Sequence, residues 1–317
     1  MCTRLTACIF LSFAIYLMEC SISKSEDIEN HKNYKLLPKD CGTSYADRII
    51  GGKNAALGQY PWLARVGYEL PNCTKKILFR CGGALINDLY VLTAAHCTTG
   101  LPKIRCPRTG KDVTFALKTI ALGELDTTKD PDCDANMCAA PIQKIELERV
   151  IVHQHFQSPP FKNDISLIRL KKKVDLNGWV APICLPRGEQ LSNFYVGKMM
   201  EVAGWGATNV TDPKESKMLM FVKLPTVEAV QCSHLFNVDV DIDETTQMCV
   251  GGELNHDSCA GDSGGPLMYV EAYNGPPRYY ELGLVSFGVK KCGQKGKPAI
   301  YTRVAGFINW ILDNISP

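Results

Sequence analysis

The body of this sequence lacks strong net charge and long apolar runs. Its 35 lysines and arginines nearly balance 33 aspartates and glutamates, which gives a formal net charge of +2. A protein that neutralises many phosphates normally carries a marked basic excess, so nucleic acid is not expected as a partner. After residue 20 no apolar run approaches the roughly 20 residues that a spanning helix needs, so a membrane is not expected as a partner either. Internal repeats and low-complexity tracts are absent as well.

The first twenty residues resemble a secretion signal. Arg4 supplies a positive start, an apolar run extends from Leu5 to Leu17, and Glu19 ends it. This length is typical of a signal-peptide core and too short for a spanning helix. We therefore expect residues 1–20 to be a signal peptide and the mature protein to be secreted and extracellular.

Cysteines are plentiful, but the C-x-x-C pairs typical of zinc sites are missing from the mature chain. Of 15 cysteines, three (Cys2, Cys8 and Cys20) lie in or at the edge of the signal, which leaves twelve. An even number in an oxidising compartment predicts six disulfides. The alternative, zinc ligation, lacks the spacing it needs, and no metal site is expected from the cysteines.

Two regions follow the signal. Residues 21–40 are polar and charged without periodicity, which predicts a disordered or extended segment, and we expect residues 21–48 as a whole to be a pro-segment. Across residues 49–317, short apolar and β-branched runs alternate with Gly, Pro, Asn and Asp turns, a pattern typical of an all-β sandwich or barrel. One helix is predicted near the end, because apolar residues between Val304 and Ile315 recur at three- and four-residue steps.

Three short motifs supply the parts that amide hydrolysis needs, in the order His, Asp, Ser. They are Thr93-Ala94-Ala95-His96-Cys97, Asn163-Asp164-Ile165-Ser166-Leu167 and Gly261-Asp262-Ser263-Gly264-Gly265-Pro266. Hydrolysis of an amide at neutral pH needs a nucleophile, a base that activates it and donors for the oxyanion. Each motif alone is a weak signal, whereas all three in this order are a specific one.

These motifs closely resemble those of the trypsin/chymotrypsin family, whose triad has this chain order. The resemblance covers residues 49–317 and implies two packed six-stranded antiparallel β-barrels with a C-terminal helix and the active site between the barrels. It implies a serine endopeptidase in which Ser263 is the nucleophile, His96 its base and Asp164 the residue that orients the histidine. It also implies an oxyanion hole formed by the backbone N–H groups of Gly261 and Ser263.

The same resemblance places Asp257, with Ser258 beside it, at the base of the primary substrate pocket. A buried carboxylate is costly without a cationic partner, so this pocket is expected to accept Arg or Lys. Gly288 would keep the pocket mouth open. Ala299 stands where the family usually has glycine, and its methyl group would narrow the base of the pocket. We therefore expect arginine to be preferred over lysine.

The segment Arg48-Ile49-Ile50-Gly51-Gly52 resembles the activation site of the family. Cleavage after Arg48 would free the amine of Ile49, which by this resemblance pairs with Asp262 and organises Gly261. Because the activating enzyme must cleave after arginine, it is itself expected to be trypsin-like. Serpin-type inhibitors are expected as further partners.

Part of the disulfide framework follows from the resemblance, which also implies that one bond tethers the cleaved pro-segment. The implied pairs are Cys81–Cys97, Cys232–Cys249, Cys259–Cys292 and the tether Cys41–Cys184. Four cysteines remain, with three possible connectivities. Proximity along the chain favours Cys133–Cys138 and Cys73–Cys106.

The stretch from Leu122 to Pro141 resembles the insertion of arthropod clip-type cascade proteases, which act in melanisation and Toll-type immune signalling. The pro-segment holds only Cys41, so the six-cysteine clip module is missing, and a venom protease of the same lineage fits equally well. Calcium is a candidate ligand of this stretch, as in some relatives, and a solvated acidic loop is the alternative. The acidic residues concerned are Glu124, Asp126, Asp130 and Asp132. No cofactor is otherwise required.

Two rival functions remain, a non-catalytic homologue that acts as a binding adaptor and a digestive trypsin. Adaptors usually replace the nucleophile, whereas all three triad residues are present here. Digestive trypsins usually discard their pro-segment, whereas Cys41 would retain it. Sequons for N-glycosylation occur at Asn72, Asn209 and Asn314.

Overall fold

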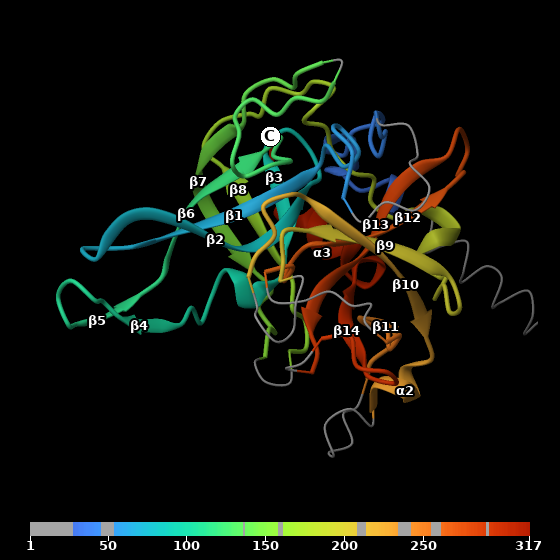
Figure 1. Cartoon of the computed structure of the whole chain (residues 1–317). Helices are drawn as coiled ribbons and strands as arrows, with labels where there is room; N and C mark the ends of the chain where they lie inside the picture. Colours follow the sequence, from blue (N-terminus) through green and yellow to red (C-terminus); the bar gives the residue numbers. More distant parts are fainter. Residues whose placement is uncertain are drawn as a thin grey trace, which may run out of the picture.

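Two closed β-barrels pack side by side and form most of the protein (Figure 1). The computed structural model describes residues 28–45, 54–135, 137–157, 161–207, 214–233, 242–254, 261–289 and 292–317. The first barrel consists of β1 (Leu63–Leu70), β2 (Thr74–Leu85), β3 (Tyr90–Thr93), β6 (Ala116–Leu122), β7 (Gln143–Val152) and β8 (Ser166–Leu170). The second consists of β9 (Met199–Gly204), β10 (Met220–Val227), β11 (Gln247–Gly251), β12 (Pro266–Glu271), β13 (Arg278–Phe287) and β14 (Pro298–Arg303). The predicted pair of six-stranded antiparallel barrels is confirmed.

Each barrel closes on itself. The strand order is β1-β2-β3-β8-β7-β6 in the first and β10-β11-β14-β13-β12-β9 in the second, and every pairing is antiparallel. Closure leaves no unpaired sheet edge in either barrel. A separate two-stranded sheet, β4 (Lys103–Arg105) with β5 (Asp112–Thr114), projects beyond the first barrel.

An aromatic cluster joins the two barrels. The fully buried Trp62, just before β1, contacts the Met268 sulfur of β12 through Nε1 at 3.1 Å, and its ring lies 5.2 Å from that of Tyr279 on β13. The hydroxyls of Tyr60 and Tyr279 both donate to one carboxylate oxygen of Glu201 on β9, at 2.9 and 3.1 Å. Because these side chains bury large apolar areas and satisfy their polar tips, they hold the barrels in one relative position.

The helical elements that lie wholly within the described ranges are short. They are η1 (Tyr34–Leu36), η2 (Ala95–Cys97), η3 (Gly188–Leu191), α2 (Ala229–Ser233), η4 (Val304–Phe307) and α3 (Ile308–Asn314). The predicted C-terminal helix is present, but its first turn is 3₁₀ (η4), a tightening that is common at helix termini. Ile308, Ile311 and Ile315 are buried, as their spacing indicates. Within the described ranges, no helix has the length and apolar character needed to cross a membrane.

The expectation of a disordered or extended segment is wrong for residues 28–40. Ile28 is buried, and the Asn33 amide donates to the carbonyl groups of Leu312 and Ile315 at 2.8 and 2.9 Å. The backbone of Gly42 also pairs with that of Tyr279. The prediction considered only the segment's own residues, which have no periodicity. The segment is ordered because it packs on the surface of the domain that it covers.

Glu281 is a fully buried carboxyl group in β13, opposite Met268 of β12. Neither carboxyl oxygen has a hydrogen-bond partner within the described part of the chain. Burial raises the pKa of Glu281 well above its ordinary value of 4.5, because the apolar surroundings disfavour the charged form. Burial therefore favours the neutral acid over the carboxylate, at a cost to stability.

Replacing Glu281 with methionine is expected to raise the free energy of unfolding by about 1–3 kcal/mol at pH 7, because it removes a buried unpaired polar group. Because the pKa of Glu281 is raised in the folded state, the unfolded state loses this proton first as pH rises above about 4.5. The destabilisation that Glu281 causes therefore grows with pH until pH reaches the raised folded-state pKa. Denaturant unfolding at pH 4 and pH 8 should show a larger gain at pH 8. A gain independent of pH would contradict this, and Glu281→Gln serves as the uncharged polar control.

Candidate active site

The histidine and aspartate motifs meet because two strands pair. β3 leads into η2, which carries His96, and Asp164 precedes β8, while Thr93 of β3 lies opposite Ser166 of β8. His96 Nδ1 lies 2.7 Å from Asp164 Oδ2, and the His96 backbone N–H donates to Oδ1 at 2.9 Å. Asp164 is fully buried. The carboxylate thus orients both the ring and the backbone of the histidine.

Two further residues that hold Asp164 were not identified from the sequence. Ser286 Oγ, on β13, donates to Asp164 Oδ2 at 2.6 Å, and Thr302 Oγ1, on β14, donates to the Asp164 carbonyl at 2.8 Å. Both come from the second barrel. Neither has a local sequence signal, because the contact exists only once the barrels have packed. A first-barrel carboxylate is thereby fixed by second-barrel hydroxyl groups.

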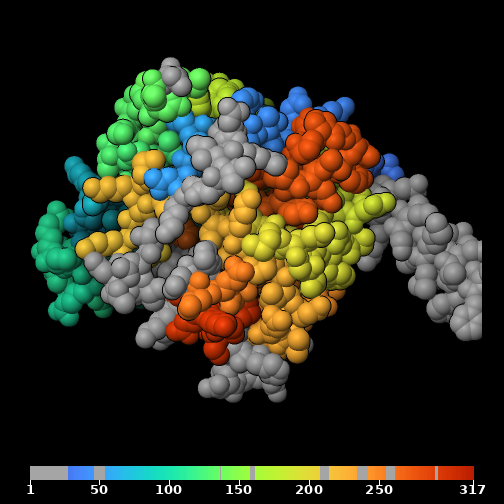
Figure 2. Space-filling model, turned by 45° about the vertical axis from the view of Figure 1, so that its right-hand side comes forward, coloured from blue at the N-terminus to red at the C-terminus, as the bar shows by residue number. Residues whose placement is uncertain are grey.

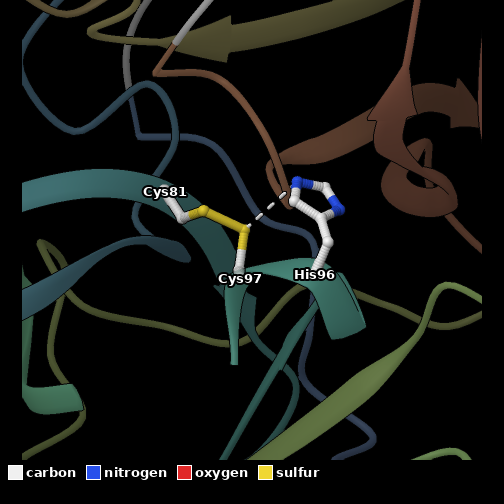
Figure 3. Close-up of side chains that lie close together, drawn as sticks. All are labelled: Cys81, His96 and Cys97. Carbon is white, nitrogen blue, oxygen red and sulfur yellow. Dashed lines mark hydrogen bonds between the residues drawn. A yellow bond between two sulfur atoms is a disulfide. The ribbon is translucent and has the colours of Figure 1, made fainter. Parts of the chain in front are cut away.

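Ser263 lies in the turn before β12, where the two barrels touch. Its carbonyl accepts the N–H of Gly82, on β2, at 2.8 Å. The Cys97 sulfur lies 3.5 Å from the same carbonyl oxygen and 3.7 Å from His96 Nε2 (Figure 3). One sulfur atom therefore lies near both motifs, close to the histidine ring on one side and to the Ser263 backbone on the other. The pairing of His96 Nε2 with the Ser263 hydroxyl stays a prediction.

Figure 3 also shows why the cluster of Cys81, His96 and Cys97 does not resemble a metal centre, although their potential ligand atoms lie within 4.8 Å of one another. The two sulfurs are joined in a disulfide. A metal-ligating cysteine is a thiolate, so neither sulfur is available as a strong ligand. The bond instead fixes β2 against the histidine turn.

The backbone beside Ser263 contains a residue with a positive φ angle. Gly261 has φ +104°, a region that other residues rarely adopt. The carboxylate of Asp262 accepts the N–H of Gly206 at 2.9 Å and lies against Gly204 and Gly206, where a Cβ atom on either glycine would overlap it. Asp262 is thus held in a close-fitting cradle of backbone.

An aromatic pair flanks His96. The Phe161 ring contacts the His96 ring edge-to-face at 5.8 Å between centroids and stacks on Phe287 at 4.9 Å. Phe161 has φ +61°, a conformation that costs energy for a non-glycine residue and directs its ring to this place. The pair lies between the histidine and the end of β13.

The structure describes only part of the predicted substrate pocket. Gly288 is exposed, and a Cβ atom added to it would lie 3.0 Å from that of the buried Ala299, so these two residues face each other. Asp257 and Ser258 lie outside the described residues, as do Arg48 and Ile49 of the activation site. The roles assigned to these four residues remain predictions.

Five of the six expected disulfides join described residues. They are Cys41–Cys184, Cys73–Cys106, Cys81–Cys97, Cys133–Cys138 and Cys232–Cys249. Of the three connectivities left open for four cysteines, the one favoured by proximity is present. Cys292 is also disulfide-bonded, while its expected partner Cys259 lies outside the described residues.

The four acidic residues of the proposed calcium loop bond to the protein itself. Glu124 Oε2 pairs with Arg65 at 3.2 Å, and Asp132 accepts the backbone N–H groups of Leu125 and Asp126 at 2.7 and 3.0 Å. The Asp126 carboxylate accepts from Thr128, and that of Asp130 accepts the N–H of Ile142. Calcium would have to displace several of these donors, and its binding stays a prediction.

Two of the three sequons lie in the described residues. Asn72 is exposed, but the Cys73 that follows it is bonded to Cys106. The Asn314 amide donates to the carbonyl of Trp310 at 2.8 Å. Asn209 lies outside the described residues. Glycosylation at all three stays a prediction.

Comparison with known proteins agrees with the geometry of the site. The trypsin family model matches residues 49–311. The chain is 40% identical over 285 residues to the Spaetzle-processing enzyme of Drosophila melanogaster, covering 87% of this chain and 68% of the relative. It is 38% identical over 299 residues to phenoloxidase-activating factor 1 of Holotrichia diomphalia, covering 92% and 77%.

A solved structure is similar as well. The crystal structure of the Drosophila Grass clip serine protease of the Toll pathway superposes with a TM-score of 0.74 at 31% identity, over 91% of this chain and 77% of that one.

Proposed function

Because this chain belongs to the trypsin family of serine endopeptidases, we propose that it is a secreted zymogen that, once cleaved after Arg48, hydrolyses peptide bonds after arginine or lysine. Residues 1–20 would be the signal peptide, 21–48 the tethered pro-segment and 49–317 the protease domain. The observation that carries the proposal is the buried Asp164 carboxylate bonded to His96, with the Cys97 sulfur near both that histidine and the Ser263 backbone.

The proposed catalytic steps use these residues in the roles that the motifs predict. Ser263 Oγ attacks the carbonyl carbon of the substrate while His96 Nε2 takes its proton, and the bond to the leaving amine breaks as the histidine returns that proton. Asp164 holds the proton on Nδ1 and stabilises the imidazolium. The backbone N–H groups of Gly261 and Ser263 stabilise the oxyanion. Water then attacks the acyl-enzyme by the same proton route.

Zymogen activation is supported by the cradle around Asp262. The freed ammonium group of Ile49 would pair with this carboxylate and fix the turn that carries Gly261. Packing against Gly204 and Gly206 gives the carboxylate little freedom to take another position, so a change in its partner is transmitted to the neighbouring oxyanion donor.

A role in an extracellular immune or melanisation-type cascade is supported by three features. Relatives carry names such as Spaetzle-processing enzyme and phenoloxidase-activating factor. An arginine at the proposed activation site requires an upstream trypsin-like protease. The Cys41–Cys184 bond would retain the pro-segment, unlike that of a digestive trypsin. Protein substrates, an activating protease and serpin-type inhibitors are the proposed partners.

The test of the proposed function is hydrolysis of matched peptides by the cleaved protein. Peptides with arginine at the cleavage position should be cleaved. Matched lysine peptides should be cleaved with a roughly tenfold lower kcat/KM, and cleavage of phenylalanine peptides should not be measurable. The lysine penalty is assigned to the Ala299 methyl group, so Ala299→Gly should bring the two values together.

Ser263→Ala is the control for this test, because it removes the nucleophile and leaves the fold. A cleaved protein that hydrolyses none of the peptides would contradict the proposal and favour a binding adaptor. Equal arginine and lysine values in the unaltered protein would contradict only the assignment of Ala299.

A further inference from the structure

Two hairpins leave the first barrel beside the catalytic histidine and carry a concentration of positive charge. One is the outer part of strand β2 in the β1–β2 hairpin, residues 74–80, and the other is the β4–β5 hairpin, residues 103–114; we call them the basic hairpin pair. They lie side by side at one edge of the molecule (Figures 1 and 2). The Cys73–Cys106 disulfide joins them, and Arg108 donates to the Asn72 carbonyl at 2.7 Å.

The charge on this surface is local and unpaired. The pair holds seven cations, all exposed, and a single acid, Asp112, whereas the whole chain has a formal net charge of +2. Asp112 lies opposite Arg105 in the strand register. Among the described residues none of the seven has an ion-pair partner within 4.0 Å. They are Lys75, Lys76, Arg80, Lys103, Arg105, Arg108 and Lys111.

The β4–β5 hairpin presents its cations outward for a structural reason. Ile104 and Val113 are opposed on one face and pack against the hydrophobic core. Side chains alternate along a strand, so Lys103 and Arg105 lie on the opposite, solvent face. The burial of one face thus fixes the direction of the charge on the other.

Position relative to the active site indicates what this surface binds. Arg80 directly precedes Cys81, whose disulfide to Cys97 lies against His96, and Lys75 is about 17 Å further along β2 at the usual strand rise. In the proposed function the substrate arginine enters a pocket of the second barrel. A substrate that crosses from one barrel to the other at the cleaved bond would bring the residues after that bond to the first barrel, along this side.

We propose that the basic hairpin pair binds an acidic stretch of the protein substrate that follows the cleaved bond by about four to eight residues. An extended chain of that length spans the distance from His96 to Lys75. Attraction of this kind acts mainly on the rate of association and is screened by salt. The inference rests on the proposed protease function and adds a second contact for the same substrate.

The test uses synthetic peptides with one cleavable arginine sequence. One carries eight Asp and Glu residues beginning four residues after the arginine, one carries a Gly/Ser tail there, and one carries the acidic tail before the arginine. At low salt the first should be cleaved with about tenfold higher kcat/KM than the other two, and 0.5 M salt should remove most of the difference.

The variant Lys75→Glu, Lys76→Glu, Lys103→Glu should abolish this preference while cleaving the Gly/Ser peptide at an unchanged rate. Its matched control is Lys171→Glu, Lys172→Glu, Lys173→Glu, an exposed run elsewhere on the first barrel, which makes the same change in net charge and should keep the preference. Loss of the preference in both variants would show a general charge effect and overturn the proposal.

Two other outcomes are informative. Equal cleavage of all peptides, combined with retention on immobilised heparin that only the hairpin variant loses, would overturn the proposal in favour of a sulfated polysaccharide. Failure to cleave even the Gly/Ser peptide would overturn the proposed protease function itself, and the inference with it. The Gly/Ser peptide thus separates failure of the function from failure of the acidic contact.

Discussion

Replacing Asp164 with asparagine is expected to lower kcat by about 10⁴-fold and leave the barrels folded. Three donors converge on this carboxylate, from the His96 backbone, the His96 ring and Ser286. An amide keeps one acceptor and introduces a donor. The histidine would then accept at Nδ1 and carry its proton on Nε2, where it cannot take the proton of Ser263.

The measurement is kcat on an arginine peptide, with thermal unfolding to show that the fold is retained. Ser286→Ala is the matched control, because it removes one donor and leaves both carboxylate oxygens; its loss of kcat should be far smaller than that of Asp164→Asn. Activity of Asp164→Asn within tenfold of the parent would contradict the assigned role.

Replacing Arg48 with glutamine is expected to keep the chain uncleaved by trypsin-like proteases and to hold its activity about 10²–10³-fold below that of the cleaved form. That range is the usual cost of one lost oxyanion donor. Without the ammonium group of Ile49, the Asp262 turn would not fix Gly261 in its active position. Exposure to a trypsin-like activator, followed by peptide hydrolysis, measures both effects.

A rescue experiment distinguishes a missing cleavage from a damaged fold. Residues 44–48 would be replaced by the recognition sequence of an unrelated protease that cuts just before Ile49, and treatment with that protease should restore full activity. Activity of the uncleaved Arg48→Gln chain equal to that of the cleaved parent would show that no activation step exists.

The sequence predicted the features that have local patterns. The alternation of apolar runs with turn residues, together with the three motifs, predicted the two β-barrels. The apolar spacing between Val304 and Ile315 predicted the C-terminal helix, although its first turn, η4, is a 3₁₀ helix. Proximity alone selected Cys133–Cys138. In each case the information lies within a few residues or in a motif that a known family shares.

Features that depend on contacts between distant elements were not predictable. Ser286 and Thr302 reach Asp164 only across the barrel interface. The order of residues 28–45 comes from the surface beneath them, and Glu281 lies in a run that reads as an ordinary strand. The basic hairpin pair was also missed, because its two halves are separated in the sequence and the net charge of the chain conceals them.

The bond between Cys41 and Cys184 has a practical consequence for following this protein. Scission between residues 48 and 49 would change the number of polypeptides, while the mass of the covalent assembly would grow only by the one water molecule that hydrolysis adds. Electrophoresis without a reductant would therefore not separate the two forms. An antibody or dye that binds residues 28–41 would stay with the active enzyme in any complex that the enzyme forms. Its signal would therefore show the location of the active enzyme, not the place where the chain was cleaved.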